Sequence, residues 1–498
     1  MTSSTTEARP ALDMKTKLFY GLGALSFGVK DNGFSYLLLL FYNQVIGLPA
    51  TNVGLALMIA LLIDACIDPL IGEVSDNLRS RWGRRHPFMY AAAVPIALAY
   101  AAVWNPPHWS APALFGYLIV CAVGVRALVS LYEVPSAALA AELIDQYDER
   151  SALLSYRMFF AWIGGLSIQL LAFTVLLRPD ATHAVGQLNP AGYARYGLIA
   201  ALVMFIAMLT SAIGTHHCIP MLRTPPPPRR LTVTRALAEA RETLSNRSFL
   251  FLMASTLASA LIIGVAAALN QYFNTYFWGL SAHQIAGLTA GVFLSAFIAL
   301  FAGPRIARRL GKRTTTMSLL VAAVGVGLAP ILLRLAGVMP PNHTPALYAI
   351  IFAVSVIGVT FGIVSLTMGG AMIADVVEVA ELKTGRRSEG LFFAASTFVS
   401  KAVSGFGVLG ASILIQAIGL KSGVDPATVP PAVLRHLALI YCPLALVFYA
   451  TAFTLLFGYK ITRASHQDVL QRLADRSIKA IGSSAVVRPL RSRQEIEP

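Results

Sequence analysis

Two aspartates stand one helical turn apart in an apolar part of the sequence. Asp64 and Asp68 belong to residues 61–87, a stretch that begins hydrophobic and ends in a turn rich in arginine. On a helix, positions i and i+4 lie on one face, so both carboxylates aim at the same neighbour. A carboxylate at the centre of a membrane span costs roughly 2.5–3.5 kcal/mol on insertion scales. Such a pair needs a compensating role, and we interpret it as a cation site.

Further ionisable and hydroxyl residues interrupt other apolar runs: Lys30, Asp31, Ser130, Glu133, Arg157, Thr397 and Lys401. Lys30 and Asp31 are adjacent, so they point in different directions on a helix and need not pair. In one interpretation the charges form internal ion pairs that hold the helices together, and Arg157 reaches the water interface as long side chains do.

In the other interpretation these residues form a binding site. The Asp64–Asp68 pair holds Na⁺ or Li⁺ through oxygen ligands, or one of its carboxyls carries a proton. The remaining acids and bases hydrogen-bond a neutral polyol, whose hydroxyls both donate and accept. Lys401 then bridges a carboxylate of the other half, as both gate and ligand contact.

The composition indicates a polytopic membrane protein with the lipid bilayer as its surroundings. Of 498 residues, 56% are hydrophobic and 13% are charged, against about 25% charged in soluble chains. The net charge of +15 fits the excess of Lys and Arg in cytoplasmic loops, so nucleic acid is not an expected partner. Nucleophile–base pairs, metal motifs and phosphate loops are missing at the required spacings. We therefore expect neither an enzyme nor a cofactor.

Apolar runs of membrane-spanning length recur along the chain. We predict twelve spans, at residues 18–43, 51–75, 87–104, 112–141, 152–177, 192–214, 248–276, 283–303, 315–336, 346–373, 390–417 and 433–459. The longest gap contains four consecutive prolines at 225–228, which end any helix, and residues 232–245 are expected to form an amphipathic surface helix. The predicted order is an N-terminal tail (1–17), a six-helix bundle (18–214), a central loop (215–247), a second six-helix bundle (248–459) and a C-terminal tail (460–498).

The distribution of basic residues predicts the orientation. Lys and Arg gather after the second, sixth, eighth and tenth spans, whereas residues 43–51, 279–281 and 338–345 contain none. The positive-inside rule then places both termini in the cytoplasm. The localisation expected is the plasma membrane, which is the inner membrane in a Gram-negative bacterium.

The two halves also repeat each other. AELID (141–145), Arg150-Ser151 and FFA (159–161) match AMIAD (371–375), Arg387-Ser388 and FFA (392–394), and the turn GRR (83–85) matches GKR (311–313). The order of the matches is the same in both halves. Two six-span halves in one orientation fit the parallel-repeat plan of the major facilitator fold, with a substrate held between the halves near mid-membrane.

Several of these motifs together resemble the glycoside–pentoside–hexuronide:cation symporters, a melibiose-permease-like family. The segments that carry the resemblance are FGVKD (27–31), DACIDP (64–69), RSRWGRR (79–85), EVP (133–135), YRMFF (156–160), residues 375–390 and Lys401. They are spread over both halves. The resemblance implies an all-α transporter that carries a sugar, glycoside or uronate together with H⁺ or Na⁺, by alternating access and as a monomer.

The resemblance also implies a role for each site residue. Asp64, Asp68 and Ser130 would bind the coupling cation, with Na⁺ at the two aspartates as one alternative. Substrate contacts would come from Lys30, Asp31, Glu133, Arg157, Thr397 and Lys401. Cytoplasmic gates would be formed by Arg79, Arg81, Arg84, Arg85, Asp375, Arg386 and Arg387.

The chain departs from melibiose permease in ways that bear on ion and substrate. Ile67 stands where that protein has an asparagine, which removes an oxygen ligand and favours a proton. Glu133 replaces an aspartate, and Ala137 stands where a tryptophan would stack on a sugar ring, so the pocket is expected to be wider or its occupant different. Two alternatives stay open: an amphipathic solute such as a lysolipid, carried by eukaryotic relatives, and a transporter-like sensor that binds a ligand without flux.

Overall fold

The computed structural model describes residues 12–144, 147–222, 247–384, 389–459, 465–469, 471–472 and 475. Within these residues the regular structure is helical, without a strand. The predicted amphipathic helix at 232–245 and the predicted gate residues Arg386 and Arg387 lie outside the described part.

Eleven helices in the described part are long and apolar enough to cross a membrane. The helical bounds are α4 (Ala50–Asn77), α5 (His86–Val103), α6 (Ala111–Leu143), α7 (Tyr147–Leu171) with the π-helical turn η3 (Ala172–Leu176), α8 (Pro190–His216), α10 (Arg247–Tyr272) with the π-helical turn η6 (Phe273–Phe277), α11 (Ala282–Leu310), α12 (Lys312–Leu335), α13 (Pro345–Thr384), α14 (Glu389–Ala417) and α15 (Pro431–Leu456). They correspond to the second to twelfth predicted spans.

The first predicted span is helical but is not one regular helix. It is built from α1 (Met14–Leu22), α2 (Leu25–Asn32), the π-helical turn η1 (Gly33–Leu37), the short α3 (Leu38–Leu40) and a second π-helical turn, η2 (Phe41–Val45). Each π-turn inserts a residue and turns the following side chains to a new face. The polar residues of this span can therefore face partners that a regular helix would not reach.

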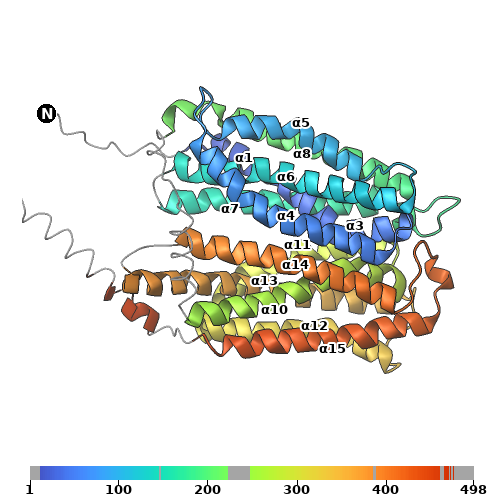
Figure 1. Cartoon of the computed structure of the whole chain (residues 1–498). Coiled ribbons are helices and arrows are strands. Elements are labelled where there is room, and N and C mark those ends of the chain that lie inside the picture. Colours follow the sequence, from blue (N-terminus) through green and yellow to red (C-terminus); the bar gives the residue numbers. More distant parts are fainter. Residues whose placement is uncertain are drawn as a thin grey trace, which may run out of the picture.

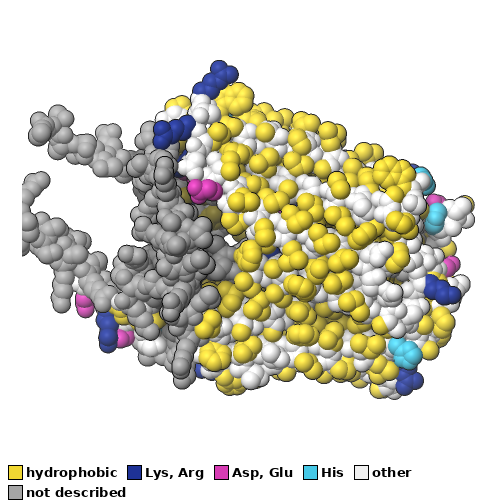
Figure 2. Space-filling model, viewed as in Figure 1, with side chains coloured by type: hydrophobic (Ala, Val, Ile, Leu, Met, Phe, Trp, Pro, Cys, Tyr) yellow, Lys and Arg dark blue, Asp and Glu magenta, His cyan; other side chains and the backbone are white. Residues whose placement is uncertain are grey.

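The helices form two bundles that lie against each other, α1–α8 and α10–α15 (Figure 1). The bundles meet where α4 packs on α14 and α7 packs on α11. Both α1 and the segment after α15 lie at one end of the molecule, which we call the terminal end, and the opposite end is the distal end. Figure 2 shows hydrophobic side chains over the middle of one face and charged side chains toward both ends, as expected for a chain that spans a bilayer.

Glycines allow the closest helix contacts on which the site depends. A Cβ at Gly28 of α2 would lie 1.8 Å from the carbonyl oxygen of Ala161 in α7. At the contact between the halves, a Cβ at Gly54 of α4 would lie 2.1 Å from Ser412 Oγ in α14. Small residues at these crossings let the backbones approach, the usual device for packing helices in membranes.

Candidate functional site

Two pairs of residues, each one helical turn apart, face each other across α4 and α6. Asp64 and Asp68 belong to α4, and Arg126 and Ser130 belong to α6. The Ser130 hydroxyl donates to Asp64 Oδ1 at 2.9 Å, and Arg126 Nη1 donates to Asp64 Oδ2 at 3.3 Å. Asp64, Arg126 and Ser130 are buried. Because a buried carboxylate needs a counter-charge, this geometry explains how α4 tolerates an aspartate at this depth.

Lys401 brings a second positive charge from the other half of the molecule. Its ammonium on α14 lies 2.5 Å from Asp68 Oδ2 and 3.2 Å from Asp64 Oδ2. The sequence prediction that both aspartates aim at one neighbour is confirmed, and so is the predicted bridge between the halves. The lysine nitrogen contacts the same carboxylate oxygens that would hold a cation.

Arg126 is not among the site residues predicted from the sequence, although a signal for it is present. It is a charged residue inside the fourth apolar run, four positions before Ser130. That spacing places it on the same face of α6 as the hydroxyl. Its guanidinium also lies over the Phe34 ring, 5.3 Å from the ring centroid, so aromatic and carboxylate groups both stabilise its charge.

Lys30 and Asp31 extend the polar cluster toward α2. Lys30 is buried, and its ammonium lies over the Phe27 ring at 4.6 Å and 3.7 Å from Asp31 Oδ1. The two neighbours therefore do form a loose ion pair, although their positions on a helix do not require it. The side chain of Asp31 is 56% exposed, so its carboxylate is available to a ligand.

A second ion pair lies one turn further along α6. The carboxylate of Glu133 pairs with the guanidinium of Arg157 in α7. Arg157 is buried and also donates to Ser136 Oγ at 2.9 Å and to the Glu133 carbonyl oxygen at 3.2 Å. The interpretation in which Arg157 reaches the water interface is therefore wrong, because the pairing with Glu133 makes a buried guanidinium tolerable.

Three buried polar atoms beside these ion pairs have no hydrogen-bond partner among the described residues. They are Asp68 Oδ1, Arg126 Nε and Glu133 Oε2. Buried polar groups are normally hydrogen-bonded, and exceptions call for an explanation. The Asp68 oxygen can take up a proton or bind a cation, and the other two atoms can pair with a solute hydroxyl, which both donates and accepts.

Thr397, Arg79 and Arg81 lie apart from these contacts. Thr397 is on α14 one turn before Lys401 and is exposed, and no hydrogen bond joins its hydroxyl to the cluster in the described part of the chain. Arg79 and Arg81 are exposed in the turn after α4, and Arg81 lies over the Trp82 ring at 5.8 Å.

The rest of that basic turn forms a buried network at the terminal end. Arg85 Nε donates to Glu142 Oε1 at 2.7 Å, and its Nη1 donates to Ser75 Oγ at 2.6 Å. Arg85 also pairs with Asp76, and Arg84 Nε lies 2.9 Å from Glu142 Oε1. Glu142, in the last turn of α6, is thus the acid that fixes this turn to the bundle.

The second half repeats this arrangement around Asp375. Lys312 Nζ, from the matching basic turn, lies 2.6 Å from Asp375 Oδ1 near the end of α13. The hydroxyl of Tyr459 donates to Asp375 Oδ2 at 3.3 Å. Burial raises the pKa of the Tyr459 phenol, and the neighbouring Asp375 charge adds to the effect. Each half thus pairs its basic turn with an acid, although Glu142 aligns with Met372 in the sequence repeat and Asp145, which aligns with Asp375, lies outside the described residues.

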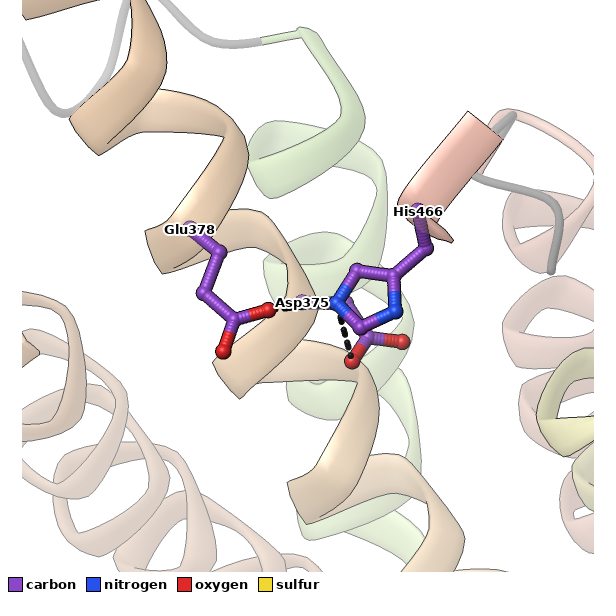
Figure 3. Close-up of side chains that lie close together, drawn as sticks. All are labelled: Asp375, Glu378 and His466. Carbon is purple, nitrogen blue, oxygen red and sulfur yellow. Dashed lines mark hydrogen bonds and ion pairs between the residues drawn. The ribbon is translucent and has the colours of Figure 1, made fainter. Parts of the chain in front are cut away.

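A histidine from the segment after α15 joins this second network (Figure 3). His466 Nε2 lies 3.4 Å from Asp375 Oδ1 and pairs with Glu378 one turn further along α13. Ligand atoms of the three residues lie within 4.8 Å of one another, which suits a divalent metal ion. However, the Lys312 ammonium already lies against Asp375, so the acids have a resident positive charge.

Polar contacts close the distal end of the molecule. Asn43 donates to Ser422 Oγ at 2.9 Å and accepts from the Tyr272 hydroxyl at 2.8 Å. Gln44 accepts from the Tyr276 hydroxyl at 2.9 Å. Apart from the bonds of Lys401, every hydrogen bond between the two halves in the described residues lies at this end. Asn43 and Gln44 are not among the residues predicted from the sequence, although they stand side by side at the end of an apolar run.

Two helical bundles with a buried ionic link between them define a multi-pass membrane transporter of the major facilitator class. Residues 19–463 match the family model described as MFS/sugar transport protein, and the chain belongs to this family. A solved D-xylose–proton symporter shares the fold, with a TM-score of 0.60 and 15% identity over 91% of this chain and 98% of that chain.

Curated relatives align over most of the chain. The inner membrane symporter YicJ of Escherichia coli is 27% identical over 93% of this chain and 95% of its own length. The isoprimeverose transporter of Lactiplantibacillus pentosus is 24% identical over 80% and 79%. The sphingosine-1-phosphate transporter MFSD2B of Mus musculus is 27% identical over 83% and 82%.

Proposed function

We propose that the protein is a secondary active transporter that couples a cation to the uptake of a sugar, glycoside or uronate. The observation that carries this proposal is the ionic link between the two halves, in which Lys401 Nζ lies 2.5 Å from Asp68 Oδ2 and 3.2 Å from Asp64 Oδ2. This link lies between the two halves, where alternating access requires a substrate to bind. The sugar class is supported by the family and by the relative named an isoprimeverose transporter.

The cation and the substrate divide the site between them. Asp64, Asp68 and Ser130 hold the coupling ion, which is H⁺ or Na⁺, and Ile67 between the aspartates favours H⁺ because it supplies no oxygen. The substrate-binding residues are Lys30, Asp31, Glu133, Arg157, Thr397 and Lys401. Because both halves of the site come from one chain, a monomer is sufficient.

The orientation follows from the charge of the loops. The terminal end carries the basic turns and is cytoplasmic by the positive-inside rule. The hydrogen bonds at the distal end then seal the external side, while the 56% exposure of the Asp31 side chain leaves the site accessible. This arrangement corresponds to a state open to the cytoplasm, with the networks of Arg85 and Asp375 beside the cytoplasmic entrance as gates.

Coupling acts through the Lys401 bridge. With both aspartates ionised, the ammonium on α14 is attracted to α4 and holds the halves together. When Asp68 takes up a proton or another cation, its attraction for Lys401 falls, and the contact between α4 and α14 is free to change. Binding of ion and solute thus alters the relative energy of the two orientations, as a ligand must if it is to shift a conformational equilibrium.

The test is a solute screen followed by flux. Purified protein is screened by thermal unfolding against pentoses, hexoses, glycosides, uronates and lysolipids, because a bound ligand stabilises the folded state. Each stabilising solute is then assayed for uptake into vesicles with a proton or sodium gradient imposed separately. Uptake of a sugar driven by one gradient supports the proposal. Uptake of lysolipids alone, or stabilisation by a sugar without any flux, contradicts it.

A further inference from the structure

Asp64 has a counter-ion, Arg126, in its own half of the protein. Arg126 and Asp64 lie on α6 and α4, which pack on each other in the first bundle. Lys401 belongs to the second bundle. When the halves rock, the ammonium of Lys401 moves with α14, whereas the guanidinium of Arg126 stays beside Asp64. A guanidinium remains protonated at all relevant pH values, so Asp64 keeps its counter-charge throughout the cycle.

Both carboxylate oxygens of Asp64 are also engaged. Its Oδ1 accepts from Ser130, and its Oδ2 contacts both Arg126 and Lys401. An alkali-metal ion binds through oxygen atoms, and a guanidinium offers donors but no acceptor. An ion entering here would lose one carboxylate as a ligand and would meet the repulsion of a fixed positive charge.

Asp68 does not replace the ligand oxygens that an alkali-metal ion loses at Asp64. Asp68 Oδ2 is held by Lys401, and Asp68 Oδ1 is the free carboxylate oxygen of this pair. Ile67, the neighbouring residue in the sequence, contributes no oxygen. One free oxygen suits a proton, which needs a single acceptor, better than an ion that needs several ligands.

We propose that Arg126 is a resident counter-ion that excludes Na⁺ and Li⁺ from the Asp64–Asp68 pair. This inference rests on the proposed function, in which that pair is the coupling site, and it narrows the coupling ion to H⁺. It also assigns Arg126 as the residue that determines ion specificity.

The experiment measures binding of the alkali ions alone. Thermal unfolding of the purified wild-type protein is followed while NaCl or LiCl replaces choline chloride at constant ionic strength and pH. The same titration is run on Arg126→Ala, on Arg126→Met, which keeps a long side chain without the charge, and on Arg126→Lys, which keeps the charge. No substrate is needed, so the result does not depend on whether the protein carries sugars.

We expect the wild type and Arg126→Lys to unfold at the same temperature in all three salts. Arg126→Ala and Arg126→Met should gain a saturable stabilisation by Na⁺ or Li⁺, of about 2 °C or more at ten times the dissociation constant. A second substitution, Asp64→Asn, should abolish that gain. A saturable alkali response of the wild type, or none in the two uncharged variants, overturns the inference.

If both uncharged variants fail to fold, Ile67→Asn keeps the inference testable. This substitution adds an amide oxygen next to Asp68 while the arginine remains. The inference expects no response to Na⁺, because the fixed charge still opposes the ion, and a saturable response overturns it. A failed sugar screen combined with the expected salt results would refute the proposed substrate class but leave the assignment of Arg126 intact.

Discussion

The ammonium of Lys401 lies 2.5 Å from Asp68 Oδ2, and this contact joins α14 of one bundle to α4 of the other. The two residues are 333 positions apart in sequence. An ion pair between membrane-spanning helices has few competing partners in the surrounding lipid, so its formation and loss can affect how the two bundles lie against each other.

Removing this bridge should impair coupled transport. We expect Lys401→Gln to reduce gradient-driven uptake by about tenfold or more, because the contact is a charge-assisted hydrogen bond of about 1.5–3 kcal/mol and its loss leaves Asp68 unpaired. Lys401→Arg, which keeps the charge, should retain more of the activity. Uptake is measured in vesicles with the solute identified by the screen. A wild-type rate for Lys401→Gln would show that the bridge has no part in coupling.

The Glu133–Arg157 pair should contribute strongly to stability. Glu133→Gln leaves the buried guanidinium of Arg157 without its counter-charge, at an expected cost of about 3–5 kcal/mol. The double variant Glu133→Gln/Arg157→Gln should recover part of this loss, because neither charge then remains unpaired. Thermal unfolding in detergent measures both effects. Arg178→Gln, at an exposed loop position, serves as the matched control and should change little. Equal stability of Glu133→Gln and the wild type would contradict the prediction.

The closed distal end should depend on Asn43. Asn43→Ala removes the hydrogen bonds to Ser422 and Tyr272, each worth about 0.5–1.5 kcal/mol. We therefore expect the distal end to open more often, by roughly fivefold to tenfold. The readout is the rate at which a thiol reagent labels a cysteine placed at Leu280, a buried position whose backbone carbonyl accepts from Gln187 of the other half. The same cysteine in Asn105→Ala, whose amide bonds only within its own turn, provides the reference rate. Equal labelling in the two proteins would mean that Asn43 does not hold this end closed.

The segment at 465–469 should be held to α13 through His466. Its imidazole contacts two carboxylates, Asp375 and Glu378, so His466→Ala should increase hydrogen exchange in this segment. Glu378→Gln should act in the same way. The double variant should exchange no faster than His466→Ala, because each of the two substitutions breaks the same contact between His466 and Glu378. Treatment with a chelator should leave the exchange unchanged if Lys312 and the imidazole supply the positive charge. Faster exchange after chelation would instead identify a metal ion as the link.

The membrane-spanning fold could be predicted from the sequence because its cause is local. Twenty consecutive apolar residues must be helical in a bilayer, where backbone groups have no water to bond, and all the predicted spans are helical. The irregular first span could not be foreseen, since its π-turns depend on how residues 33–45 pack against other helices. The common orientation of Asp64 and Asp68 was also predictable, because a spacing of four residues places both side chains on one face of a helix.

The partners of those residues were decided by the tertiary structure alone. The sequence indicated that Lys401 bridges a carboxylate of the other half but not that this carboxylate is Asp68, and nothing in it places Glu133 beside Arg157. These contacts depend on which helices pack together and at what depth. The same holds for Arg126. The sequence shows a charged residue in an apolar run, and only the packing of α6 on α4 shows that this arginine neutralises Asp64. The sequence by itself determined the class of protein and the cost of its buried charges, and the tertiary structure decided how that cost is offset.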